Sequence, residues 1–385
     1  MKVLKEKKET LFSQENAALD FFEAVNENSL WEVVSAGEIK AKEIPYCPIM
    51  AEEVKKTVGL SDTVSTDSVM ENMDENLCLG LKYPGGFFPL GETGFLSALQ
   101  RAGYMQSAAL SGREEKANFR PMTPEERVIV LNIGLKTQKN KHFMLLLRDE
   151  KIRYVGSSEY VPLNFNQLMK IFRNGLAANF DAVTFAGASA THEYFSVSYD
   201  LKSDELECHF MDVLMDSGLG SDGVISIRAK LVSSDVGLSG ANIYPYITVN
   251  GEERMVGRPI CLEHKGEADY YSFNCNTDKI FALFKESEEK LEAMALKKVR
   301  HPADAVRKIC KAAGLPKKLS LEEAEEFKSL FENPSQLDVY WTVYAIYEAA
   351  KEDGTFSTAK KLFVEEAIAR AIYSMDEYDL PFEWI

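Results

Sequence analysis

The feature of this sequence that most constrains its fold is a change in hydrophobic period. Between residues 182 and 273, apolar and polar residues alternate, most clearly over 195–199 and 225–231. A period of two belongs to strands that bury one face. Asn250-Gly251, between two such runs, is a typical two-residue hairpin turn. The stretch therefore predicts antiparallel strands.

Helical signals lie on both sides of this stretch. Thr123-Pro124-Glu125-Glu126 supplies a cap, a Pro at the first helical position and a capping-box Glu, which predicts a helix to about residue 136. Residues 142–148 and 152–156 predict two strands joined by Asp149-Glu150-Lys151. The region after residue 276 is predicted to be helical. Its expected N-caps and stops are Asn276, Ser320, Ser335, Gly314 and Gly354.

Strands followed by helices favour an α+β fold over an alternating one. We predict a central antiparallel sheet over about residues 142–273, helices on one side of it, and a helical C-terminal region. A chain of 385 residues carries roughly two or three domains. The predicted divisions are a mixed N-terminal region (1–120), an α+β central domain (121–275) and a helical C-terminal region (276–385).

Composition narrows the class of protein. With 45% hydrophobic and 27% charged residues, the chain has enough apolar surface to fold. It has no apolar run of about 18 residues and no apolar stretch after its basic N-terminus, so we expect neither a membrane span nor a secretory signal. The six Cys lack paired spacing, which favours reduced thiols in a cytoplasm. The net charge of −16 disfavours nucleic acid and membranes on average.

No catalytic motif survives a check of its context. The G-x-G-x-x-G at residues 218–223 precedes an alternating strand, whereas a dinucleotide site needs a helix there. Cys261-x-x-His264 is half of a zinc site, and no C-x-x-C completes it. We predict no catalytic residue, no metal ligand and no cofactor. The abundant carboxylates leave a metal-dependent hydrolase or nuclease as an alternative.

Two basic clusters stand out from the acidic background. Residues 297–318 hold eight Lys or Arg and one acid, and a second cluster lies between residues 136 and 153. Such clusters can neutralise phosphates, or they can be solvated helix surfaces that balance neighbouring acidic runs. If they bind nucleic acid, the predicted ligands are Lys297, Lys298, Arg300, Arg307, Lys308, Lys311, Lys139, Lys141 and Arg153.

Three segments of the chain resemble one family. Residues 152–175 have a strand, the turn Ser158-Glu159-Tyr160 and a Pro162-Leu163-Asn164 helix start. Residues 225–247 contain Ser233-Ser234-Asp235-Val236-Gly237, followed later by Arg258-Pro259-Ile260-Cys261. Residues 341–372 form a Tyr- and Ala-rich helix before an amphipathic one. Over about 145–375 the chain resembles the phage- and plasmid-associated family called domain of unknown function 932.

The resemblance implies a mobile element (a phage, plasmid or prophage) in a bacterial cytoplasm, and it supplies no catalytic residue. The turn lacks the Arg that the family usually has there, and no Asn-Gly follows Cys261. The residues that match the family motifs are Tyr160, Pro162, Asn164, Ser234, Asp235, Gly237 and Cys261.

Two functions follow as the leading hypotheses. The first is a homo-oligomeric protein that binds single-stranded DNA or RNA, acting in recombination or annealing, because such a protein needs basic backbone contacts and no triad. The second is an anti-defence or other protein-binding module that engages a host protein through an acidic surface. Both favour a binding protein over an enzyme.

Overall fold

The computed structural model describes residues 2–4, 8–104, 122–216, 225–352, 354 and 356–384. The motif at residues 218–223 and the predicted boundary at residue 120 lie outside these ranges. Three antiparallel sheets account for the named strands. The strands are β1 Thr10–Phe12, β2 Ser29–Ser35, β3 Lys40–Glu43, β4 Leu79–Tyr83, β5 Gly86–Pro89, β6 His142–Arg148, β7 Lys151–Ser157, β8 Ala182–Ala190, β9 Phe195–Lys202, β10 Ile225–Ser233, β11 Ala241–Val249, β12 Glu252–Met255 and β13 Ile260–Leu262.

Half of the chain is helical, as expected of an α+β protein. The helices are α1 Glu15–Glu27, α2 Ala51–Val58, α3 Thr66–Asp74, α4 Glu92–Arg101, α6 Pro124–Thr137, α7 Phe165–Asn179, α8 Asp204–Asp216, α9 Tyr270–Thr277, α10 Ile280–Leu296, α11 Pro302–Ala313, α12 Lys317–Leu330, α13 Gln336–Lys351 and α14 Thr358–Tyr378, with short 3₁₀ turns Ala36–Glu38 and Pro48–Met50. Among the described helices, none combines the length and the apolar composition that crossing a membrane requires.

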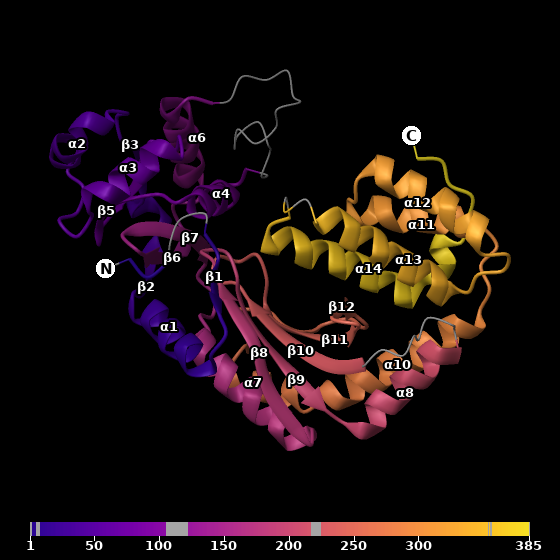
Figure 1. The fold of residues 1–385 in the computed structure, drawn as a ribbon. Helices are drawn as coiled ribbons and strands as arrows, with labels where there is room; N and C mark the ends of the chain where they lie inside the picture. The colour runs from indigo at the N-terminus through magenta and orange to yellow at the C-terminus, as the bar shows by residue number, and fades with distance from the viewer. Residues whose placement is uncertain are drawn as a thin grey trace.

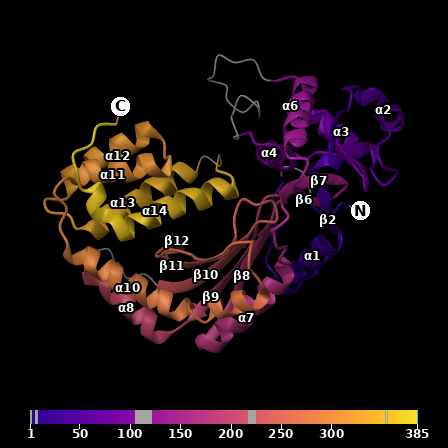
Figure 2. The ribbon, with the colours of Figure 1, turned by 180° about the vertical axis from the view of Figure 1, so that it is seen from behind.

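The largest sheet has seven strands in the order β1-β8-β9-β10-β11-β12, with β13 also paired to β11. It curls between the N-terminal part of the chain and the C-terminal helices (Figures 1 and 2). Along β9, Phe195, Val197 and Tyr199 are buried, whereas the intervening serines are partly exposed. The helices α7, α8 and α10 run along the outer face of the sheet, which explains the alternation.

The predicted fold class is confirmed, with one change in the extent of the sheet. The hairpin β6–β7 forms as expected, but it pairs with β2 in a three-stranded sheet of its own, while β3, β4 and β5 form another. The large sheet therefore begins at β8 and gains β1 from the N-terminus. Periodicity identifies a strand, but it carries no information on the sheet to which the strand belongs.

Most of the predicted helix caps and turns are confirmed. Thr123 and Ser335 cap α6 and α13 through capping boxes. Asn250 and Gly251 both have positive φ in the β11–β12 turn. The predicted caps Ser320 and Asn276 are wrong, because α12 already begins at Lys317 and residue 276 lies in the last turn of α9.

Two hydrophobic cores hold the chain together. The larger one joins the seven-stranded sheet to α1, α7, α8 and the C-terminal helices. Its centre includes the tyrosines of α13, of which Tyr340 and Tyr344 are fully buried. The smaller core runs from Val34 to Val155 and joins the two three-stranded sheets to α2, α3, α4 and α6. The two parts meet around β7, where the candidate site lies.

Candidate functional site

The basic run after residue 297 lies beside acidic residues of α12 and α14. Lys297 Nζ is 2.5 Å from Asp376 of α14. Arg307 pairs with Asp304 of its own helix at 3.2 Å and with Glu325 of α12. Asp376, Asp304 and Glu325 therefore neutralise part of this cluster within the chain.

The other predicted ligands of this run differ in their surroundings. Lys308 donates to a carbonyl oxygen of α14, and Lys311 Nζ lies 5.4 Å from the ring centre of Phe382. Lys298 and Arg300 are exposed. These contacts leave the positive charge in place, but none of the four side chains lines the cavities described below.

The second basic cluster divides into a surface half and a buried half. Lys139 and Lys141 are exposed. Arg148, Lys151 and Arg153 are 1%, 0% and 3% exposed. The prediction put Arg153 on the surface as a phosphate ligand, and the structure puts it inside, where its Nε donates to the carbonyl oxygen of Arg148 at 3.4 Å. The strand β7 packs against both β6 and α4, and this burial causes the difference.

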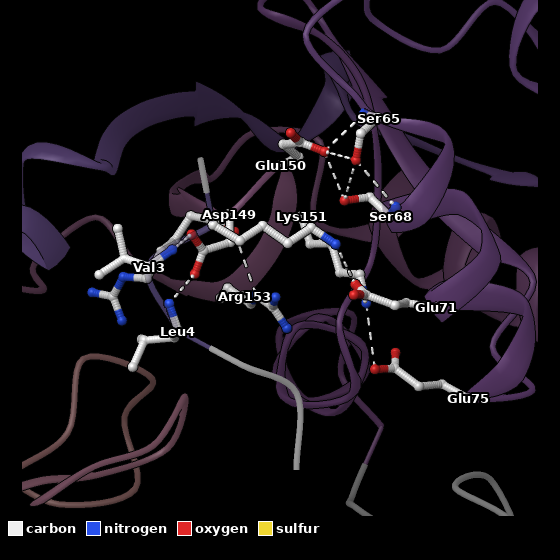
Figure 3. A network of polar contacts seen from close by, with 12 residues as sticks. Val3, Leu4, Ser65, Ser68, Glu71, Glu75, Asp149, Glu150, Lys151 and Arg153 are labelled. Atoms are coloured by element: carbon white, nitrogen blue, oxygen red, sulfur yellow. Dashed lines mark hydrogen bonds and ion pairs between the residues drawn. The ribbon is translucent and has the colours of Figure 1, made fainter. Parts of the chain in front are cut away.

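The buried half belongs to a polar network around the β6–β7 turn (Figure 3). Asp149 and Glu150 both have positive φ, 50° and 65°, a conformation that Asp tolerates but that is uncommon for Glu. The Asp149 carboxylate accepts hydrogen bonds from the backbone N–H groups of Val3 and Leu4 at 2.9 and 3.2 Å. Lys151 Nζ lies 3.2 Å from Glu71 of α3. The turn thus ties the N-terminus and α3 to the hairpin.

Glu150 completes the network at the start of α3. Its Oε2 accepts hydrogen bonds from Ser65 N–H at 2.7 Å, Ser65 Oγ at 2.6 Å and Ser68 Oγ at 2.7 Å. Burial acts to raise the pKa of the Glu150 carboxyl, but these hydrogen bonds outweigh burial and hold the pKa below its usual value. These contacts offset the strain of the turn. We interpret the network as structural.

The family-motif residues come from distant parts of the sequence and meet beside β7. Tyr160 Oη donates to the carbonyl oxygen of Ser234 at 3.2 Å, and its ring stacks on both Trp31 and His264. Gly237 has φ 74°, and a Cβ there would lie 2.7 Å from Tyr154 Oη. Burial raises the pKa of the Tyr160 hydroxyl, which therefore stays protonated at neutral pH.

Of the remaining motif residues, all but Cys261 lie next to this contact. Asp235 pairs with the buried Arg148, and it lines a small cavity together with Pro162 and Asn164. Cys261 lies on β13, exposed and opposite a residue of β11. The motif thus builds a junction between the small sheet of β2, β6 and β7 and the edge of the large sheet.

His264 is the titratable centre of this junction. Its Nδ1 lies 3.0 Å from the carbonyl oxygen of Val161, so Nδ1 carries the proton and donates. Nε2 is then the acceptor for Ser233 Oγ at 3.0 Å. Burial lowers the pKa of the ring, which keeps it neutral. Ser233 is 1% exposed and does not line the adjacent cavity, so this pair anchors β10 rather than presenting a nucleophile.

Both ring nitrogens of His264 are thereby occupied, which removes the zinc site that Cys261-x-x-His264 suggested. Nowhere in the described ranges do three or more His, Cys, Asp or Glu side chains come together as a metal site.

Two cavities adjoin at this junction. One of about 310 Å³ is lined by the Gly237–Gly240 loop and Lys265, the other of about 400 Å³ by Lys141, and both share Arg101, Ser157 and Glu159. We call the two together the Arg101 groove. Its charged lining comprises three cations (Arg101, Lys141, Lys265) and two carboxylates (Glu159, Glu263), hence one net positive charge.

The pairing of these charges decides which of them can hold a ligand. Lys265 Nζ is 2.5 Å from Glu263, so that charge is partly compensated. Within the described parts of the chain, no carboxylate forms an ion pair with Arg101 or Lys141, and Arg101 Nε is buried without a hydrogen-bond partner. In a chain of net charge −16, the groove therefore carries a local positive charge that can attract an anion.

A third cavity, of about 340 Å³, has a predominantly acidic lining. It is lined by four glutamates (Glu9, Glu75, Glu92 and Glu193) against Lys8 and Arg153. The lining also includes residues of the β8–β9 turn and of the loop before α14. An excess of carboxylates repels phosphate and attracts cationic groups.

Sequence reasoning selected Lys141, Tyr160 and Gly237 of the groove but missed Arg101 and Lys265. Arg101 ends α4 and Lys265 follows β13, and neither stands in a cluster of like charge. Only packing brings them together, so no local signal could have identified them.

Comparison of the chain with protein-family models, with curated proteins and with solved structures finds no match.

Proposed function

We propose that this protein binds single-stranded nucleic acid, with the phosphate backbone lying in the Arg101 groove. The observation that carries the proposal is the presence of Arg101 and Lys141 in one cavity without carboxylate partners among the described residues. Arginine and lysine without an internal carboxylate partner gain most from a phosphate, because no existing ion pair has to be broken. The Gly237–Gly240 loop presents backbone with little side chain at the other end.

The shape of the groove supports a single strand over a duplex. Cavities of about 310 and 400 Å³ hold groups the size of one or two nucleotides. Tyr160 contributes no stacking platform, because its ring already stacks on Trp31 and His264 and is 8% exposed. Binding should therefore rest on phosphates, with little sequence preference and a strong dependence on salt.

The dependence of binding on salt concentration can be predicted quantitatively. For single strands, log K falls against log[salt] with a slope of about −0.7 per phosphate neutralised. Contacts from Arg101 and Lys141, the two cations without a carboxylate partner, predict a slope of about −1.4. Fluorescence anisotropy of a labelled oligothymidine, titrated at several salt concentrations, measures both affinity and slope.

Variants separate the groove from the other basic cluster. Arg101→Gln and Lys141→Gln should each weaken binding and make the slope less negative by about 0.7. Lys318→Gln is the matched control, because it removes one charge from an α12 side chain that is 90% exposed. If oligothymidine fails to bind at low salt, or if Lys318→Gln weakens binding as much as the groove variants, the proposal is wrong.

A second function is favoured by the acidic cavity. This cavity of about 340 Å³ is lined by four glutamates against Lys8 and Arg153, and Glu75 also pairs with Lys151. The net negative charge suits a cationic side chain of a protein partner, which is the chemistry of a module that engages a basic host protein. A pull-down from bacterial lysate with the native chain and with Glu9→Lys tests it. A stoichiometric partner that the variant loses supports this function. Recovery of the same partner by both proteins, or of none, counts against it.

The biological setting rests on the family resemblance, which implies a phage, plasmid or prophage. The genes beside this one would distinguish the two functions. A neighbouring nuclease or single-strand-binding protein would favour recombination or annealing. A group of small accessory genes would favour anti-defence.

A further inference from the structure

Helix α6 carries apolar side chains on the face where a surface helix is normally polar. Its exposed residues include Glu125, Ile129, Ile133 and Lys136, spaced four, four and three apart. This spacing returns to one side of an α-helix, so the four side chains form one stripe. Ile129 is 52% exposed and Ile133 is 55% exposed.

The inner side of the same helix is fully engaged, so the outer isoleucines are not needed for the fold. Leu131 and Leu135 pack into the smaller core. The Asn132 side chain accepts from the backbone N–H of Ala41 at 2.8 Å and donates to its carbonyl oxygen at 2.9 Å. A helix that is apolar on all sides is typical of one buried on all sides. Something is therefore expected to cover the outer stripe.

The order of residues along the stripe is self-complementary. From the N-terminus it reads acid, apolar, apolar, base: Glu125, Ile129, Ile133, Lys136. Two copies packed antiparallel across a two-fold axis bring each Glu125 opposite the partner's Lys136 and each Ile129 opposite the partner's Ile133. Antiparallel packing also sets the two helix dipoles in opposition, which is favourable. Neither Glu125 nor Lys136 is held in an ion pair by another described residue.

We propose that α6 is a self-association surface through which two copies of this chain pair antiparallel. The helix lies at the top of the N-terminal part in both views, on the side away from the large sheet (Figures 1 and 2). One pair of 14-residue helices covers less than the roughly 1,200–2,000 Å² of stable interfaces. The dimer should therefore be weak and should form with rising concentration. This inference does not depend on nucleic-acid binding.

Sedimentation equilibrium of the full chain over about 10 to 500 µM tests the surface, since a weak pair has a micromolar Kd. The native protein should shift from monomer toward dimer across this range. Ile129→Glu should stay monomeric. Leu296→Gln, which changes a still more exposed apolar residue on α10, should associate like the native protein. Circular dichroism confirms that each variant is folded.

Charge reversal tests the antiparallel register itself. Glu125→Lys alone sets two lysines against each other at both ends of the pair, and Lys136→Glu alone sets two glutamates. Each single variant should weaken association at least tenfold, and the double variant should restore it. A native protein that is monomeric throughout, an Ile129→Glu variant that still dimerises, or a double variant that stays monomeric would each overturn the proposal.

Discussion

Removing the carboxylate of Asp235 should destabilise the protein, because it leaves the Arg148 guanidinium buried without its anionic partner. Arg148 is 1% exposed. Its Nη2 bonds to Asp235, its Nε donates to Ser29 Oγ at 2.7 Å, and its guanidinium lies 5.3 Å from the ring centre of Phe195. The desolvation of the cation persists in the variant, whereas the attraction that offsets it is lost.

The surroundings of Arg148 determine how much stability the variant should lose. Breaking a buried ion pair by removing one partner costs about 3–5 kcal/mol. Here Ser29 and Phe195 still contact the cation, and the Asp235 side chain is 13% exposed, so water can enter the vacated position. We therefore expect Asp235→Ala to lower the free energy of unfolding by about 3 kcal/mol, at the lower end of that range. Asp235→Asn keeps a neutral acceptor and should cost about half as much.

Urea unfolding followed by circular dichroism measures these changes in the free energy of unfolding. The double variant Arg148→Met with Asp235→Leu removes both charges and should be more stable than Asp235→Ala. Glu322→Gln is the control, since it breaks an ion pair with Lys318 on the surface of α12 and should leave the midpoint unchanged. If Asp235→Ala proves as stable as Glu322→Gln, Arg148 is not held as we argue.

Other consequences can be tested by pH and by substitution. Burial raises the pKa of Tyr246 and Tyr344 well above 10.0, so the stability that these residues contribute is complete below pH 10.0 and falls as the pH rises. Phenolate absorbance should therefore appear together with unfolding. Phenolate absorbance in the folded protein would contradict this. Burial lowers the pKa of His264 from 6.5, so its contribution to stability is present above pH 6.5 and is lost as the pH falls through the lowered value. His264→Asn should therefore make stability less dependent on pH in the acidic range. An unchanged dependence would refute the assignment. Gly237→Ala should cost at least twice the roughly 1 kcal/mol of Gly59→Ala, because both residues have similar positive φ but only Gly237 lies against another side chain; equal losses in urea unfolding would show that this contact is unimportant.

The local structure of this protein could be predicted from its sequence wherever the signals act within a few residues. The capping boxes at Thr123 and Ser335, the Asn250-Gly251 turn and the alternation along β9 and β10 all formed as expected. Each depends on hydrogen bonds or burial set by neighbours in the chain. The failed cap at Ser320 shows the limit of such signals, because Pro316 four residues earlier already starts the helix.

The sites were decided by tertiary packing. Lys141 and Lys151 are equivalent as charges in the sequence, but one lines the groove and the other is fully buried. Lys297 meets Asp376, 79 residues away in the chain, and Asp235 meets Arg148 across 87. Whether a charge is available to a ligand depends on which distant carboxylate reaches it and how much water it keeps, and both follow from the packing of whole elements. The sequence therefore determined which residues form helices and strands, and only the tertiary structure determined which cations face the Arg101 groove.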